Sequence, residues 1–212
     1  MSKEYGYIGK EVTQAFRSNK GIFTPQDIIE LDQENKWTNF GQLELIETQT
    51  ITPNVAAVDF LNIKSDIYTV HFLTCNNVQA VSDGPTIRIQ LYESGVLETG
   101  SVYNYALQYG NGAGANGSLN STTSSNILFG SNIGGSTNES GNAYCYFYNL
   151  GDNTKYSFLS MHSISTNADP NALFYFGSAV LPQQSTVDGI RLLLDSGNID
   201  TGDYSLYGIR FA

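Results

Sequence analysis

The sequence predicts an all-β protein: an antiparallel β-sandwich preceded by an extended N-terminal arm and one short helix. From residue 42 onward, short alternating or apolar runs are separated by turn residues at the spacing typical of all-β folds. The 212 residues include 14 Tyr, 11 Phe and 21 Gly, which favour strands and turns over helices. Only one segment has the start signals of a helix. A chain of this length can bury a sizeable core without a disulfide or metal.

Residues 1–23 form the predicted arm, because their apolar side chains follow no period of 2 or 3.6. Burying a large apolar side chain contributes about 1.5–3 kcal/mol, against an ordering cost of about 1–2 kcal/mol per residue. The apolar side chains of the arm are too many to remain solvated, but their burial outweighs much of the ordering cost only if the neighbouring chain also supplies backbone hydrogen bonds. We therefore expect the arm to be buried against a neighbouring chain, laid on its surface or paired with it as a strand. The side chains expected to make this contact are Tyr5, Tyr7, Ile8, Phe16, Ile22 and Phe23.

The predicted helix follows the arm. Thr24 is a good N-cap, and Pro25 suits the first helical position. Asp27 favours the positive end of the helix dipole, and Ile28 and Leu31 share one face. We expect the helix to end near Asn35. The chain is thus divided into an arm with a short helix, residues 1–41, and a β-sandwich domain, residues 42–212.

Ten strands are predicted in the sandwich domain. The run 143–148 alternates, so Cys145 and Phe147 should face the core, while Tyr144, Tyr146 and Tyr148 line the opposite face. Those three tyrosines could contact a neighbouring subunit or, alternatively, stack on the sugar rings of a glycan. The predicted strands are 42–51, 55–62, 66–75, 86–93, 101–108, 143–150, 155–164, 172–181, 187–194 and 203–211.

A tract rich in Gly, Asn, Ser and Thr separates two of these strands, between Tyr109 and Asn142. So polar a segment is expected to leave one end of the sandwich as a long excursion. It is interpreted either as a surface loop or as a contact loop for a neighbouring subunit or a glycan.

Charge and apolar content narrow the partners. The formal net charge is −10, and five of the ten basic residues lie in the first 36 positions. The remaining chain would repel phosphate, so nucleic-acid binding is not expected. No apolar run approaches a membrane span or a signal core, which predicts a protein made in the cytoplasm without membrane insertion. Cys75 and Cys145 are interpreted as buried free thiols, with a disulfide as the alternative.

No catalytic motif is present, so the chain is not expected to be an enzyme or to bind a cofactor. His71 and His162 both lie in predicted strands, and no G-x-S-x-G turn supplies a nucleophile. The carboxylates Glu44 and Glu47, and likewise Asp59 and Asp66, are neighbours in sequence. A glycan hydrolase or lyase built on such a pair is a weaker alternative.

Oxygen donors are concentrated between Asp195 and Asp203. The spacing is not that of an EF-hand, since Leu206 stands where that loop needs Glu. The segment is therefore interpreted as a hairpin turn, with calcium binding as a weaker alternative and no metal site assigned.

Two segments resemble virion structural proteins of tailed bacteriophages, especially marine ones. They are YGYIGKEVTQAFRSNKGIFTPQDI with ENKW near the N-terminus, and VDGIRLLLDSGNIDTGDYSLYGIRF at the C-terminal end. The second contains the pattern G-x-Y-x-L-Y-G-I over residues 202–209. The two segments cover about a quarter of the chain. The resemblance implies an attachment arm, a jelly-roll-like β-sandwich domain, and a role in virion assembly or host contact.

The expected function is that of a non-enzymatic virion protein, assembled in the host cytoplasm and anchored through its arm. Its partners would be other virion proteins and further copies of itself, with a trimer favoured. It would belong to a tail, fibre or baseplate appendage or decorate the capsid. The alternative is a carbohydrate-binding module that recognises a host-surface glycan.

Overall fold

The chain divides into two units, with the boundary between residues 42 and 43. The computed structural model describes residues 25–33, 43–52, 54–166 and 171–209. In the first unit, helix α1 (Pro25–Gln33) confirms the predicted helix. The second unit contains thirteen strands and no helix among its described residues. The predicted arm and the N-cap Thr24 lie outside the described residues.

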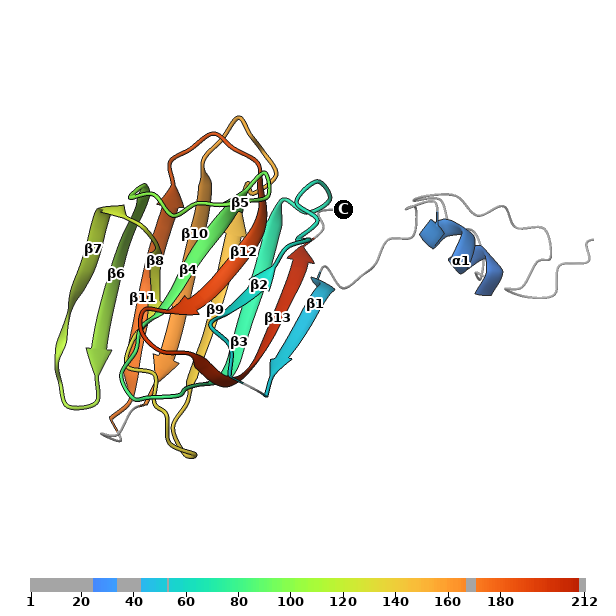
Figure 1. Ribbon diagram of the computed structural model, residues 1–212. Coiled ribbons are helices and arrows are strands. Elements are labelled where there is room, and N and C mark those ends of the chain that lie inside the picture. The colour runs from blue at the N-terminus through green and yellow to red at the C-terminus, as the bar shows by residue number, and fades with distance from the viewer. Residues whose placement is uncertain (1–24, 34–42, 53, 167–170, 210–212) are drawn as a thin grey trace, which may run out of the picture. The chain divides into compact units, whose positions relative to one another are not determined.

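The larger sheet of the second unit has eight strands, all paired antiparallel. Figure 1 shows them side by side, with β7 at one edge and β1 at the other. Their order is β1 (Leu43–Ile51), β13 (Ile199–Ile209), β3 (Val70–Ala80), β9 (Gly141–Tyr148), β10 (Ser157–Ser165), β11 (Leu173–Leu181), β6 (Tyr103–Asn111) and β7 (Asn116–Ser124).

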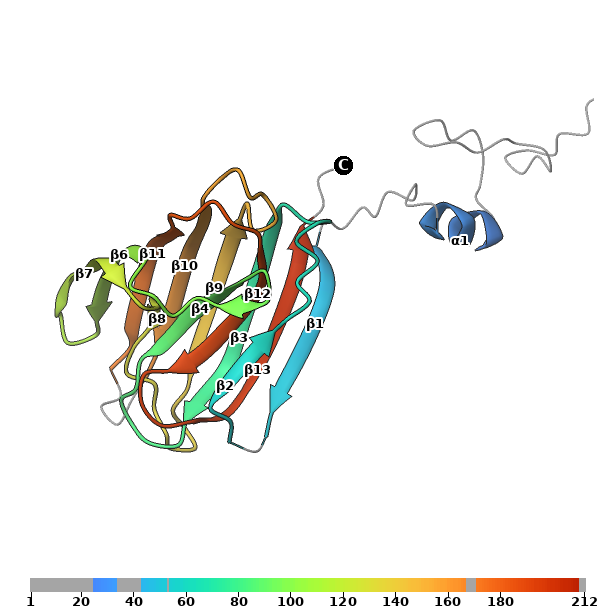
Figure 2. The ribbon, with the colours of Figure 1, turned by 45° about the horizontal axis from the view of Figure 1, so that its top comes forward.

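The smaller sheet has five strands and packs on one face of the larger sheet (Figures 1 and 2). Strand β4 is central: one edge pairs with β12, and the other pairs with β5 at one end and β8 at the other. The two antiparallel sheets confirm the predicted β-sandwich. The strands are β2 (Ala57–Phe60), β12 (Val187–Leu194), β4 (Ile87–Glu93), β5 (Val96–Leu97) and β8 (Ile127–Gly130).

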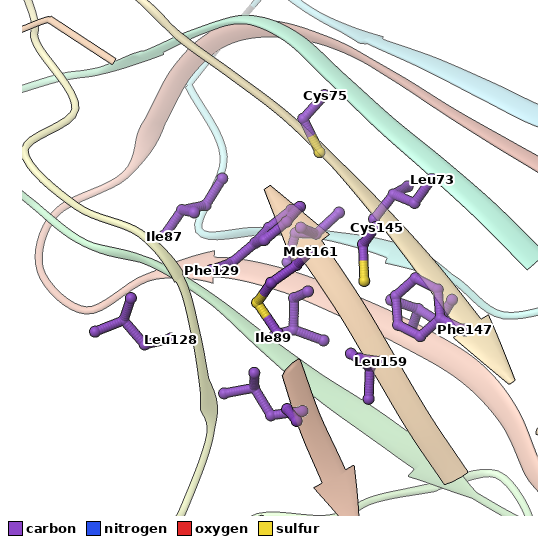
Figure 3. Packing of buried hydrophobic residues seen from close by; sticks show 14 of the residues in the cluster. Leu73, Cys75, Ile87, Ile89, Leu128, Phe129, Cys145, Phe147, Leu159 and Met161 are labelled. Atoms are coloured by element: carbon purple, nitrogen blue, oxygen red, sulfur yellow. The ribbon is translucent and has the colours of Figure 1, made fainter. Parts of the chain in front are cut away.

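The core lies between the two sheets, and Figure 3 shows part of it. Alternate residues of β4, including Ile87 and Ile89, meet Leu159 and Met161 of β10 in this layer. Cys75 and Cys145 are both fully buried there and unpaired, which confirms the interpretation as free thiols. Burial raises the pKa of both thiols well above the usual range.

All ten predicted strands are present, but the interpretation of residues 109–142 as a long excursion was wrong. Thirteen residues of that tract form β7 at the edge of the larger sheet and β8 in the smaller one. Strand β7 pairs with β6 through its backbone, which any residue except proline can do. In β8, Ile127, Leu128 and Phe129 are all buried in the core. The two-residue strand β5 was also not predicted.

Candidate functional site

The face of the eight-stranded sheet that points away from the core, called here the outer face, carries the candidate site. Residues that pair directly across a sheet point to the same side, so the strand register assigns each side chain to a face. Cys145 pairs with Leu73 and Met161, and all three are buried. The adjacent row of paired residues points to the outer face, and its side chains, among them Phe72, Tyr146 and Ser160, are exposed or half-buried.

On the outer face, three tyrosine rings gather around Phe72 of β3. The ring of Tyr146 lies 4.6 Å from that of Phe72, and the rings of Tyr144 and Tyr207 lie 6.1 and 6.2 Å away. These four side chains come from β3, β9 and β13, which are adjacent in the sheet. We call them the aromatic ridge.

Beyond β10 the same face is hollowed. One hollow of about 470 Å³ lies over β10, β11, β6 and β7, and a second of about 330 Å³ adjoins it at Ala106 and Asn120. Small side chains leave this space, because Ser178 and Ala106 occupy the positions where the ridge has rings. Phe158 and Val180 border the first hollow and Phe176 the second.

The outer face is nearly free of charge. Within its strands, as far as the structure describes them, the rows carry one carboxylate, Asp203, and one imidazole, His162. Thr50 donates a hydrogen bond of 2.7 Å to Asp203. The ring of His162 meets that of Tyr144 edge-on at 5.5 Å. Several large apolar side chains are nevertheless exposed here: Leu43, Leu45, Tyr144, Tyr148, Phe158, Ile164, Phe174 and Phe176.

On the opposite outer surface, formed by the five-stranded sheet, charged side chains pair with one another. Arg191 donates two hydrogen bonds, of 2.7 and 2.8 Å, to the carboxylate of Asp59, and it lies over the ring of Tyr92. Arg88 pairs with Asp195 at 3.2 Å. The exposed apolar surface of the sandwich is therefore concentrated on the eight-stranded sheet.

The predicted orientation of Tyr144, Tyr146 and Tyr148 agrees with the register, which places all three on the outer face. Sequence reasoning missed Phe72, Tyr207 and the phenylalanines of β10 and β11 as members of the same surface. A signal was available in residues 155–164 and 172–181, where large apolar residues occupy both alternating sets. Such two-sided strands indicate a second contact surface.

The two histidines do not form a catalytic arrangement. His71 is fully buried; its Nε2 lies 2.7 Å from the carbonyl oxygen of Ile63, and burial lowers its pKa. His162 is on the outer face, on the other side of the sheet. The four carboxylates that the sequence analysis considered, Glu44, Glu47, Asp59 and Asp66, each have a different partner or environment. Tyr68 donates to Glu44 at 2.6 Å, and Gln49 donates to Glu47 at 2.8 Å.

Asp59 is held by Arg191, as described above, and Asp66 lies in an exposed turn. A carboxylate pair that the sequence did not single out is Glu93 and Glu98. Burial raises the pKa of Glu93, whereas a hydrogen bond from the backbone N–H of Gly100 lowers that of Glu98. Gln183 donates to Glu98 at 3.3 Å, and Ser185 donates to Glu93.

The interpretation of Asp195–Asp203 as a hairpin turn was wrong, because β12 and β13 do not pair and lie in different sheets. Residues 195–198 form a turn that connects the two sheets, with Gly197 at a φ of +69°, and residues 199–203 begin β13. Asp195 accepts from the backbone of Thr86 at 2.9 Å and pairs with Arg88, while Asp203 accepts from Thr50. Among the described residues, no group of three or more His, Cys, Asp or Glu side chains is placed to hold a metal ion. The described part of the chain also contains no helix long and apolar enough to cross a membrane.

Comparison with protein-family models, with curated proteins and with solved structures finds no match for this chain.

Proposed function

We propose that this chain is a non-enzymatic structural protein of a tailed-bacteriophage virion. It is anchored through its N-terminal arm and contributes its sandwich to an oligomeric appendage of the tail, fibre or baseplate, or to a capsid decoration. The observation that carries the proposal is the outer face: a broad, nearly uncharged sheet surface with exposed rings. Contiguous apolar patches of this kind mark sites of protein contact.

Two further features support this assignment. The segments that resemble virion proteins are the arm with its helix and the C-terminal strands, and the latter supply Tyr207 to the aromatic ridge. The other polar clusters also favour a structural role, because the carboxylates of Asp59, Asp195 and Asp203 are all used in contacts within the sandwich.

Deletion of the arm tests the proposal. Particles should be prepared from infected cells in which the protein lacks residues 1–23, and their content should be compared with the lysate. The truncated protein is expected to accumulate as a folded domain in the lysate but to be absent from particles. A matched full-length variant with polar changes in the arm, Ser18→Ala with Asn19→Ala, should be incorporated normally. Normal incorporation of the truncated protein, or unfolding of its domain, would contradict the proposed role of the arm.

A second candidate function is carbohydrate binding at the hollow. Asn104 and Asn120 line the first hollow beside Phe158, and Gln108, Ser118 and Asn120 line the second beside Phe176. The Oδ1 atom of Asn104 is buried without a hydrogen-bond partner in the structure. Amide side chains can form hydrogen bonds with the hydroxyl groups of a sugar, and the neighbouring aromatic rings can stack on the face of the sugar ring. Retention on immobilised host polysaccharides, lost on Asn120→Ala and Phe158→Ala, would favour this function over assembly.

A further inference from the structure

We propose that the outer face pairs with the same face of a second copy, around a two-fold axis that runs parallel to the strands and passes between β9 and β10. This inference rests on the proposed assembly function and specifies its contact, with a two-fold dimer in place of the trimer favoured from the sequence. The axis divides the eight strands into two sets of four, in the order shown in Figure 1. In such a dimer β9 lies over β10 of the partner, β3 over β11, β13 over β6, and β1 over β7.

One row of paired residues shows why this arrangement fits. Read across the sheet, its first four side chains are large and its last four are small. A two-fold axis between the fourth and fifth positions places every large side chain over a small one, so the aromatic ridge enters the hollow of the partner. The row is Leu45, Tyr207, Phe72, Tyr146, Ser160, Ser178, Ala106 and Asn120.

In the next row the large side chain lies on the other side of the axis. There the large side chain is Phe176 of β11, and the position that meets it from the second copy is Thr74 of β3. Near the axis Tyr144 meets His162, a pair that already packs edge-on within one copy. In this row Phe176 thus faces a smaller side chain, whereas the two rings nearest the axis, Tyr144 and His162, face each other.

The hollow has room for the ridge. A cavity of about 150 Å³ accommodates one benzene ring, so a hollow of about 470 Å³ can take the rings of Phe72 and Tyr207 together. A two-fold axis across the strands would instead set β3 over β3 and β13 over β13. The ridges would then meet each other and the hollows would stay empty, which argues against that alternative.

The size of the face matches a stable dimer. Strands lie about 4.8 Å apart, and same-side residues repeat about every 6.8 Å along a strand. Eight strands and four rows therefore cover about 38 by 27 Å, roughly 1,000 Å². A typical stable interface buries about 800 Å² on each partner.

Charge also favours a second copy as the occupant. The sequence carries 20 acidic and 10 basic residues, so two copies that met through an ordinary part of this surface would repel each other. The outer face sets one carboxylate, Asp203, among uncharged rows. In the proposed pairing Asp203 lies over β6 of the partner at Gly110, so the two copies of Asp203 do not meet.

The mass of the full-length protein in solution is the first test. We expect a dimer at micromolar concentration. The variant Ser178→Arg fills the hollow and places a charge opposite Phe72, so its dissociation constant should rise about 100-fold or more. Val96→Arg, on the five-stranded sheet at a side chain that is 69% exposed, is the matched control and should remain a dimer.

Cross-linking tests the register and does not depend on that variant. Facing sheets lie about 10 Å apart, beyond the reach of a disulfide, so a short bismaleimide is suitable. Phe72→Cys mixed with Ser178→Cys should give a cross-linked dimer. Each variant alone should not, because its two cysteines would lie about 14 Å apart sideways in addition to the sheet separation. Phe72→Cys mixed with Val96→Cys is the control, and it should give none.

Several outcomes would overturn the inference: a monomer, a trimer, a Ser178→Arg variant that still dimerises, or a mixture that cross-links no better than its control. None of them would contradict the virion role, which is measured by incorporation of the arm-deleted protein into particles. If the wild-type protein is monomeric and instead retains a polysaccharide, the outer face serves the carbohydrate function and the dimer is excluded.

Discussion

Glu93 and Glu98 both contact the short segment that contains Gln183 and Ser185, yet their pKa values move in opposite directions. For Glu93 the largest cause is burial, which disfavours the charged form. For Glu98 the largest cause is the N–H of Gly100, which stabilises the charged form. The two side chains should therefore make opposite contributions to the pH dependence of stability.

We predict that Glu93→Gln raises the melting temperature at pH 7, by about 1–2 °C, and leaves it unchanged below pH ~4. In the wild type the raised pKa favours folding while Glu93 is protonated. That contribution is lost as the pH rises from the unfolded-state value through the higher folded-state value. A neutral glutamine does not lose it. Calorimetric melting across this range is the measurement.

Glu98→Gln is the matched comparison, with the sign reversed. Folding lowers the pKa of the wild-type Glu98 carboxyl group, so the carboxylate stabilises the protein at neutral pH. This contribution disappears as the pH falls through the folded-state pKa. The variant should melt lower than the wild type at pH 7 and converge with it in acid. If both variants shift melting in the same direction at pH 7, the assignment of the two environments is wrong.

The thiols give a second prediction at this scale. Cys75 and Cys145 are both 0% exposed, and burial raises the pKa of each. Because the thiolate is the reactive form, neither should react with a maleimide in the native protein at pH 7.5. Both should react in denaturant, as mass spectrometry would show. Labelling of the folded protein would mean that the core opens locally.

At the scale of elements, the pattern of short alternating or apolar runs between turn residues located ten strands. It failed where pairing depends on backbone and position more than on side-chain type. Strand β7 consists of Asn, Gly, Ser and Thr apart from Leu119, so nothing in its composition marks it as a strand. Strand β8 has a strong apolar signal, but four residues inside a polar tract are too few to be distinguished from a loop contact.

The contribution of β8 can be measured. Phe129 is 0% exposed and lies among the core side chains of Figure 3, so Phe129→Ala should cost about 3–5 kcal/mol in the free energy of unfolding. Urea denaturation is the measurement. Were residues 109–142 a surface excursion, the substitution would be nearly silent.

Thr123→Ala is the control for that experiment. It lies six residues before Phe129 in the same tract, but its side chain is exposed at the sheet edge. We expect a change within about 0.5 kcal/mol. An equally large loss in both variants would indicate that the tract responds as a unit, and the specific burial of β8 would not be supported.

At the scale of the whole molecule, the sequence was sufficient to predict a sandwich and the side on which Tyr144, Tyr146 and Tyr148 lie. It could not predict that Tyr207 joins them, because this depends on β13 inserting between β1 and β3, far away in sequence. Strand order is decided by long-range pairing, which leaves no local pattern. The hollow likewise arises from small residues on strands that become neighbours only after folding.

The charge distribution leads to a prediction for the assembled state. If two acidic molecules meet through an uncharged face, salt should not weaken the dimer, because its contacts are apolar while the repulsion between the copies is screened. The dissociation constant should stay constant or fall between about 0.05 and 1 M NaCl, where the screening length shrinks to about 3 Å. Sedimentation at several salt concentrations measures this. A dimer that dissociates in salt would be held by ion pairs and not by the outer face.

The place of β13 also has a consequence for the order of events during synthesis. Strand β1 pairs only with β13 among the described strands, and some 150 residues separate the two. While the ribosome is still translating that interval, β1 has no partner and the open edge of β3 is unprotected. Residues 199–209 close the gap, so the sheet becomes continuous late, and ribosome-bound intermediates should be the species most in need of a chaperone.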